Sequence, residues 1–251
     1  MDTIPLHASE RVDDLQINGL KIIQSHEVFS FSLDAVLLAH FCSIPQRGRV
    51  MDLCTGNGVI PLLLTTRSDH THIHGVEIQE RLVNMASRNV QLNGLDHRIF
   101  ITCGDIKSIH EIVGYGQFDL VTVNPPYLPV TAGEQNMNTH KAIARHEIHC
   151  TLEDVIMACS RLVKAGGKVA IVHRPARLIE LSNLMRDYHI EPKRMRLVHS
   201  TQDKEAMMVL IEGIKDAKPD LRVLPPLIIY NENHQYSKEI HAIYREPVRN
   251  D

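Results

Sequence analysis

Residues 49–59, RVMDLCTGNGV, contain a short apolar run that ends in a glycine turn. The apolar run over 49–54 suits a buried strand, and Gly56 and Gly58 let the backbone turn tightly and approach a ligand. A helix after Gly58 would present its first N–H groups to the same place. Pro61 stands where a dinucleotide fingerprint has its third glycine, so the stretch predicts a strand, turn and helix with a ligand but no particular dinucleotide.

The rest of the chain alternates between apolar runs and helical patterns. Strand-like runs occupy residues 72–78, 98–104, 118–124 and 167–173, and helical patterns occupy 79–94, 151–167 and 175–188. Gly94 and Thr151 are helix stop and start signals, and Ser32 is expected to cap an earlier helix. This alternation predicts an α/β fold with a mostly parallel sheet covered on both faces.

The two ends of the chain depart from strict alternation. Two runs at 193–199 and 206–213, joined by a polar turn, predict an antiparallel hairpin at the edge of the sheet. The simplest division is an N-terminal extension over 1–47 whose helix packs on the main domain, a main domain over 48–215, and a C-terminal extension over 216–251.

Composition places the 251 residues among ordinary globular proteins, with 43% hydrophobic and 23% charged residues. The formal net charge of -3 gives no whole-chain signal for nucleic acid. Locally, the segment from Arg161 to Arg196 contains nine Lys or Arg residues and only three acidic residues. This bias fits either a solvated face or an RNA-facing patch, and the sequence leaves both open.

The five cysteines are widely spaced and form no CxxC pair, which favours reduced thiols in the cytoplasm over a disulfide frame or a zinc site. The first twenty residues have no apolar signal region, and no apolar run approaches the length of a membrane span. The alternating histidines of HTHIH, residues 70–74, suit an exposed strand better than a metal site. We therefore expect neither a metal nor a membrane, and the sequence predicts no oligomeric state.

An open α/β sheet binds its ligands at the carboxyl ends of the strands. Glu77 follows the second strand at a spacing from Gly58 that suits hydrogen bonds from ribose hydroxyls. Asp105 follows the third strand and is placed to accept from the amine of an adenine. Together with the glycine turn, these positions predict a ligand that contains adenosine.

The fourth strand ends in NPPY, residues 124–127, where two prolines cannot donate to a sheet ladder. The prolines fix the backbone, so the side-chain oxygen of Asn124 and the carbonyl of Pro125 can act as two acceptors for one NH2 group on a planar carbon. Tyr127 offers a flat face for stacking on that plane. The motif predicts chemistry on an amino nitrogen.

In this order and at these spacings, DLCTGNG, VEI, GDI and NPPY resemble the class I S-adenosyl-L-methionine-dependent methyltransferases that act on an amino nitrogen. The resemblance implies a Rossmann-like seven-stranded fold with an antiparallel C-terminal hairpin, and no metal. It implies that the turn from Gly56 to Gly58 holds the methionine portion of the cofactor, Glu77 the ribose and Asp105 the adenine amine. The full set of cofactor positions expected from these motifs is Asp52, Thr55, Gly56, Asn57, Gly58, Glu77, Ile78, Gly104, Asp105, Ile106 and Asn124.

Three stretches resemble the bacterial tRNA1(Val) (adenine-N6) methyltransferases, which modify the adenosine just 3′ of the anticodon of a valine tRNA: QSHEVFSFSLDAVLLAHF at 24–41, RHE at 145–147 and VHRPARL at 172–178. The resemblance implies a tRNA substrate. Residues 125–150 form a long stretch with little periodicity, which we expect to close over the target nucleotide. The expected catalytic residues are Asn124, Pro125 and Tyr127, and the expected substrate contacts are Phe29, Phe31, Pro126, Tyr127, Arg145 and His146.

Other functions share parts of this pattern. Glutamine methyltransferases of peptide release factors also carry NPPY, but they usually have a helical domain before the glycine motif, and only 49 residues precede Val50 here. A non-catalytic module that binds the cofactor or RNA would be expected to have lost Asn124 or Tyr127, and both are present. A nucleotide-dependent oxidoreductase leaves NPPY unexplained.

Overall fold

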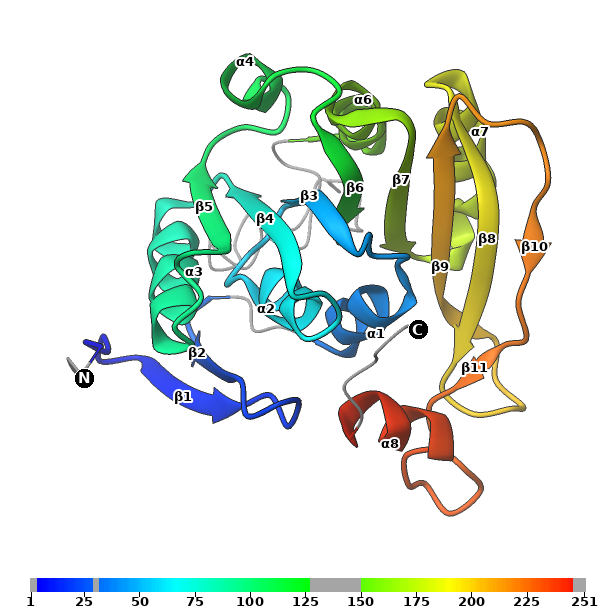
Figure 1. Cartoon of the computed structure of the whole chain (residues 1–251). Helices are drawn as coiled ribbons and strands as arrows, with labels where there is room; N and C mark the ends of the chain where they lie inside the picture. Colours follow the sequence, from blue (N-terminus) through cyan, green and yellow to red (C-terminus); the bar gives the residue numbers. More distant parts are fainter. Residues whose placement is uncertain (1–3, 29–31, 127–149, 246–251) are drawn as a thin grey trace, which may run out of the picture.

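The structure is a computed structural model that describes residues 4–28, 32–126 and 150–245 (Figure 1). The expected substrate contacts Phe29, Phe31, Tyr127, Arg145 and His146 therefore lie outside the described residues. The other residues expected at the site are described.

The chain is organised around a central sheet of mostly parallel strands (Figure 1). Its principal strands are β3 (Arg47–Leu53), β4 (His70–Glu77), β5 (Ile99–Cys103), β6 (Phe118–Val123), β7 (Val163–His173), β8 (Ile190–His199) and β9 (Ala206–Lys215). They are ordered β5-β4-β3-β6-β7-β9-β8, and β9 is antiparallel to both of its neighbours. The expected parallel sheet and C-terminal hairpin are confirmed. The short strands β10 (Arg222–Val223) and β11 (Leu227–Ile228) extend the sheet beyond β8 and were not expected.

Helices pack on both faces of the sheet (Figure 1). Those on one face are α1 (Leu33–Phe41), α2 (Val59–Thr65) and α3 (Glu80–Leu92), and those on the other are α4 (Ile109–Val113), α6 (Leu152–Leu162) and α7 (Leu178–Asp187), the last preceded by the 3₁₀ turn η1 (Pro175–Arg177). Each face has its own cluster of buried apolar side chains, so helices pack on both faces of the sheet as the alternating pattern predicts.

Several helix signals in the sequence have the expected geometry. The Thr151 hydroxyl accepts from the Asp154 N–H at 3.2 Å and the Asp154 carboxylate accepts from the Thr151 N–H at 2.9 Å, which is a complete capping box. Gly94 follows α3 with a φ of +65°. Ser32 precedes α1 as expected, but its hydroxyl donates to the Asp34 carboxylate and makes no cap bond to the helix backbone.

The boundary between α6 and β7 differs from the prediction, which continued the helix to residue 167. The helix ends at Leu162 and the chain enters β7 at once. A Cβ on Gly167 would lie only 3.0 Å from the carbonyl oxygen of Lys164 and 3.2 Å from that of Asp119. Gly167 therefore permits a close approach of two strands and does not stop a helix.

The N-terminal and C-terminal segments of the chain pack against the same hydrophobic core. An N-terminal hairpin of β1 (Glu10–Asp14) and β2 (Lys21–Ser25) leads into α1, and α8 (Lys238–Arg245) lies at the other end of the chain. One buried cluster contains Ile22 from the hairpin, Val50 from the sheet and Ile240 from α8. The division at residues 47 and 215 stays a prediction. Within the described ranges, no helix is both long and apolar enough to cross a membrane.

Candidate functional site

The carboxyl ends of four neighbouring strands meet at one edge of the sheet. Leu53 at the end of β3 is paired with Val76 on one side and with Val123 on the other, and Glu77 is paired with Cys103. The segments that follow these strands are 54–58, 78–79, 104–106 and 124–126. The register thus brings the four motifs found in the sequence to a common edge.

The loop after β3 depends on left-handed backbone conformations. Cys54, Gly56 and Gly58 have φ values of +55°, +57° and +84°. A Cβ on Gly58 would lie 3.3 Å from the Cβ of Ala86, so the absence of a side chain lets α3 pack closely against the turn. Glycine is needed here for both backbone conformation and close packing.

Asp52 is fully buried at the base of this loop. Its two carboxylate oxygens accept from the hydroxyls of Thr55 at 2.6 Å and Thr122 at 2.7 Å. Burial raises the pKa of Asp52 to about 7, although both hydroxyls favour the ionised form. Through its hydrogen bonds to Thr55 and Thr122, Asp52 connects the loop after β3 to β6. Thr122 is a partner that sequence reasoning missed.

Glu77 holds the other side of the loop. One of its carboxylate oxygens accepts from the Gly56 N–H at 3.0 Å, and the other accepts from the Gln79 N–H at 3.0 Å. Burial raises the pKa of Glu77 above its usual range. Because a carboxylate offers about four acceptor positions, this one can still accept from a ligand.

The residues after β4 and β5 have contrasting environments. Ile78 is 39% exposed beside Glu77. The Asp105 carboxylate is partly exposed, accepts from the Lys107 N–H at 2.9 Å and lies 3.6 Å from the Lys107 ammonium. Gly104 links the two strand ends, because its N–H donates to the Glu77 carbonyl at 3.0 Å. Ile106 is buried and packs in the core, and its expected contact with the cofactor stays a prediction.

The segment Asn124–Pro126 follows β6, which ends at Val123 and so stops where the prolines require. Asn124 and Pro126 are half-buried and Pro125 is buried. In the described part of the chain, no group of three or more His, Cys, Asp or Glu residues could hold a metal ion. The expectation that no metal takes part stays a prediction.

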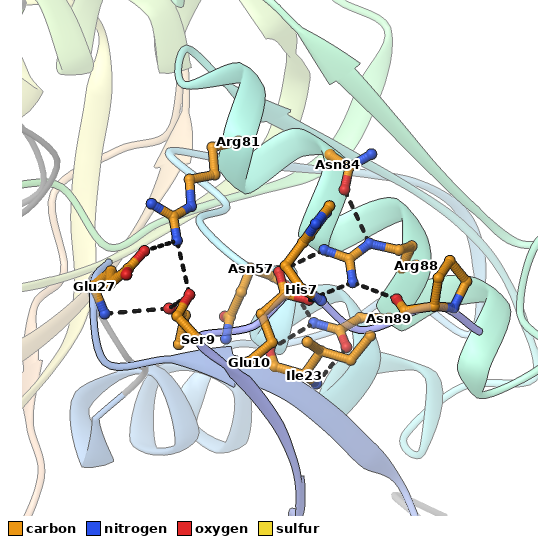
Figure 2. A network of polar contacts seen from close by, with 12 residues as sticks. His7, Ser9, Glu10, Ile23, Glu27, Asn57, Arg81, Asn84, Arg88 and Asn89 are labelled. Atoms are coloured by element: carbon orange, nitrogen blue, oxygen red, sulfur yellow. Dashed lines mark hydrogen bonds and ion pairs between the residues drawn. The ribbon is translucent and has the colours of Figure 1, made fainter. Parts of the chain in front are cut away.

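A buried asparagine on α3 supports the glycine loop from below (Figure 2). The side-chain amide of Asn89 donates to the Asn57 carbonyl at 2.9 Å and to the Ile23 carbonyl at 3.3 Å, and its oxygen accepts from the Ile23 N–H at 2.5 Å. Asn89 is fully buried. One side chain thus bridges the loop after β3 and the strand β2.

The Asn57 side chain is itself unusual. It is only 4% exposed, and its Nδ2 has no hydrogen-bond partner among the described residues. A buried donor left without an acceptor costs about 1–3 kcal/mol, so such a group is a candidate to bind a ligand.

The N-terminal hairpin is fixed to α3 by ion pairs (Figure 2). Arg88 forms a bidentate pair with Glu10, with both N–O distances at 2.6 Å, and donates to the Pro5 carbonyl at 2.9 Å. Arg81 pairs with Glu27 at 2.5 Å. The hairpin therefore rests on the same helix that packs against the glycine loop.

Sequence reasoning missed Asn89, although a signal was present. Leu82, Met85 and Ala86 are the apolar face of α3, and Asn89 continues that face one turn later. A polar residue within an apolar stripe implies a buried hydrogen-bonding role. Its partners, Ile23 and Asn57, lie far away in the sequence and only the fold identifies them.

Comparison with known proteins gives the family. Residues 19–188 match the methyltransferase small domain. The chain is 30% identical over 172 residues to the tRNA1(Val) (adenine(37)-N6)-methyltransferase of Porphyromonas gingivalis, a match that covers 68% of this chain and 66% of that protein. It is also 30% identical over 179 residues to the protein of the same name from Aeromonas salmonicida, covering 71% of this chain and 73% of that one.

Solved structures agree at the level of the fold. A predicted O-methyltransferase from Agrobacterium tumefaciens has a TM-score of 0.70 and 20% identity, covering 87% of this chain and 99% of that one. The strand order of the main sheet, with β9 antiparallel to both of its neighbours, is the class I methyltransferase arrangement that the resemblance implied. The chain therefore belongs to the methyltransferase small domain family and has the class I methyltransferase fold.

Proposed function

We propose that the protein transfers a methyl group from S-adenosyl-L-methionine to the N6 amine of an adenosine in tRNA, at the nucleotide just 3′ of the anticodon of a valine tRNA. As a member of this family the protein is a methyltransferase, and its methyl donor is S-adenosyl-L-methionine. The observation that carries the proposal is the position of Asn124 and Pro125 directly after β6, beside the loop that follows β3. A cytoplasmic location is part of the proposal, because it follows from the proposed tRNA substrate.

The residues after β3 and β4 fit the cofactor. The unpartnered Nδ2 of Asn57 suits the carboxylate of the methionine portion, and the carboxylate of Glu77 has acceptor positions left for two ribose hydroxyls. The exposed Ile78 suits one face of the adenine, and Asp105 suits its amine. When bound, the cofactor supplies a methyl group already activated on a positively charged sulfonium.

Asn124 and Pro125 orient the acceptor nitrogen. The lone pair of an adenine amine is delocalised into the ring, so the nitrogen is a poor nucleophile. Acceptors at the Asn124 side chain and the Pro125 carbonyl would hold both hydrogens and favour a geometry in which the lone pair faces the methyl carbon. After transfer, the nitrogen keeps one hydrogen and gains the methyl group, and one proton leaves.

The target nucleotide needs further contacts. Stacking on Tyr127 and contacts from Phe29, Phe31, Pro126, Arg145 and His146 are proposed on the sequence pattern, because a base in an RNA loop must leave its stack to reach a buried acceptor. The release-factor alternative uses the same two acceptors for a glutamine amide. The names of the relatives favour tRNA over that alternative.

The experiment is a methylation assay with labelled S-adenosyl-L-methionine. The wild type should label unmodified total tRNA, and hydrolysis should release the label as N6-methyladenosine. Asn124→Ala should lower the rate by about 10²–10³ while cofactor binding persists, because the acceptors act on the reacting nitrogen. Label on a purified release factor and none on tRNA would replace this function with glutamine methylation.

A further inference from the structure

We propose that the amino ends of β3, β4 and β5 form a second contact surface for the RNA, which binds phosphate and stacked bases remote from the methyl-transfer site. The inference rests on the proposed function, because it supplies the class of partner. It concerns a basic hollow and an adjoining row of rings, neither of which contains a residue assigned above to the cofactor or to the reacting nitrogen.

The basic hollow lies where these strands begin. Its volume is about 440 Å³, and its lining residues are Arg47, Asp69, His70, Thr71, His72, His97 and Arg98. The lining thus contains two guanidinium groups and three imidazoles but only one carboxylate. Arg98 is held in place by donating to the carbonyls of Thr71, at 3.4 Å, and Ser68.

Arg47 differs from Arg98 because it is exposed and forms no ion pair within the described ranges. An unpaired guanidinium at the edge of a hollow can bind a phosphate through two parallel hydrogen bonds without first breaking a protein contact. The charge and the space therefore suit the backbone of a nucleic acid.

The row of rings continues from the hollow along one face of the sheet. The ring centroids of His72 and Phe100 are 6.4 Å apart with an interplanar angle of 25°, and those of His74 and Phe100 are 5.2 Å apart. Arg49 lies on the same face, because it is paired with His72 in the register of the two strands. This row is a set of flat groups flanked by a cation.

The described helices leave the row accessible. Phe100, on the edge strand β5, is 44% exposed, and His72, on the adjacent strand β4, is also exposed. Exposed rings on a sheet with arginines beside them are the usual surface on which single-stranded bases stack. Because His72 also lines the hollow, phosphate and base contacts would be continuous.

The contrast with the basic segment 161–196 strengthens the assignment. Six of its nine cations pair with carboxylates: Lys164–Asp119, Arg177–Glu180, Arg186–Glu191, Lys193–Asp220, Arg194–Glu212 and Arg196–Glu239. Those charges are largely neutralised in place. The local excess in the sequence is thus a paired surface, whereas the cation at Arg47 is available for a polyanion.

The surface is well separated from the reacting atoms. β4 has eight residues, and at about 3.3 Å per residue its two ends lie about 25 Å apart. Changes at the hollow should therefore alter RNA affinity and leave the cofactor site unchanged. This separation makes the inference testable independently of catalysis.

The test compares Arg47→Ala and Phe100→Ala with two controls on α7. Arg186→Ala removes an exposed but ion-paired arginine, and Ile179→Ala removes an apolar side chain that is 74% exposed. Binding of an unmodified valine tRNA transcript is measured at several salt concentrations, together with S-adenosyl-L-methionine affinity, KM for tRNA and kcat.

Phe100→Ala should weaken tRNA binding by about tenfold through lost stacking. Arg47→Ala should lower the slope of log affinity against log salt by about one. Both should raise KM for tRNA while kcat and cofactor affinity match the wild type, and both α7 controls should bind tRNA as the wild type does. Binding by both variants at wild-type strength overturns this inference and leaves the proposed function intact. A wild type that neither binds nor methylates tRNA overturns the proposed function, and the inference with it.

Discussion

The side-chain amide of Asn89 donates to the backbone carbonyl of Asn57 at 2.9 Å, from a fully buried position on α3. The same amide pairs with the backbone N–H and carbonyl of Ile23. Because Asn57 belongs to the glycine loop and Ile23 to β2, one side chain holds the proposed cofactor site on the N-terminal hairpin. Loss of Asn89 should therefore affect both cofactor affinity and the stability of the hairpin, and Asn93 allows these two effects to be measured separately.

Asn89→Ala should weaken S-adenosyl-L-methionine binding by about tenfold, because it leaves the Asn57 and Ile23 backbone groups without their buried partner, at a cost of about 1–3 kcal/mol. Asn93 is the matched control. It is the C-cap residue of α3, one turn after Asn89, and its amide bridges the N–H and carbonyl of Lys21 on β2 without reaching the glycine loop. Asn93→Ala should lower stability but keep cofactor affinity, as measured by calorimetry. Equal losses of cofactor affinity in both variants would show that attachment of the hairpin, and not the hydrogen bond from Asn89 to Asn57, supports cofactor binding.

Cofactor affinity should rise with pH through about 7. Burial raises the pKa of Asp52 to about 7, so this carboxyl is partly protonated in the free protein near neutrality. A positively charged sulfonium favours the ionised form of Asp52, so binding releases a proton and tightens until the free carboxyl is ionised. Calorimetry in buffers of different ionisation enthalpy measures this release. S-adenosylhomocysteine lacks the sulfonium charge and should show a smaller effect; identical proton release for the two ligands contradicts the account.

Asp52 should also affect the pH dependence of the free protein's stability. Its pKa is about 7 when folded and near 3.8 when unfolded, so the native state binds the extra proton between these values. The free energy of unfolding should therefore fall as pH rises from about 4 to about 7, by about 4 kcal/mol if this group acts alone. Denaturant titration of Asp52→Asn should lack this decrease. Asp187→Asn, at the exposed end of α7, should retain it.

The ion pair between Arg88 and Glu10 should stabilise the hairpin strongly. The side chains are 9% and 0% exposed, and the Arg88 guanidinium holds the pKa of Glu10 below its usual range. Arg88→Ala leaves the buried Glu10 carboxylate with the His7 N–H but without its bidentate cation, and should cost about 3–5 kcal/mol. Arg11 pairs with Asp13 in the same hairpin but is 56% exposed, so Arg11→Ala should cost less than about 1 kcal/mol. Chemical denaturation of the two variants compares these costs, and similar losses would contradict a special role for Arg88.

Much of the fold follows from local sequence signals. The strand predicted over residues 118–124 should end where two prolines remove backbone donors, and β6 ends at Val123, directly before Asn124 and the two prolines. The helix beginning after Thr151 follows from its capping box, but its end does not follow from the glycines after it. Gly167 lacks a side chain because the backbone of Asp119, on the adjacent strand β6, passes close to it. A contact with a residue so far away in the sequence leaves no local sequence signal.

The N-terminal hairpin was not predicted because its stabilising contacts are remote in sequence. The β1 residues are mostly exposed, so their pattern carries little hydrophobic periodicity. The hairpin is held by Arg88, Asn89 and Asn93, which come from a helix some seventy residues further along the chain. The motifs of the site could be predicted because each follows a strand, whereas the residues that support them depend on the packing of helix against loop.

The central claim, N6-methylation of an adenosine in tRNA, is tested most directly by mapping the methyl group. An unmodified valine tRNA transcript is incubated with the protein and S-adenosyl-L-methionine, digested with a base-specific ribonuclease, and sequenced by mass spectrometry. The account predicts one methyl group, on N6 of the adenosine just 3′ of the anticodon, and none when guanosine replaces that adenosine. Methylation at another atom or nucleotide, or an unmodified transcript alongside a methylated release factor, would contradict it.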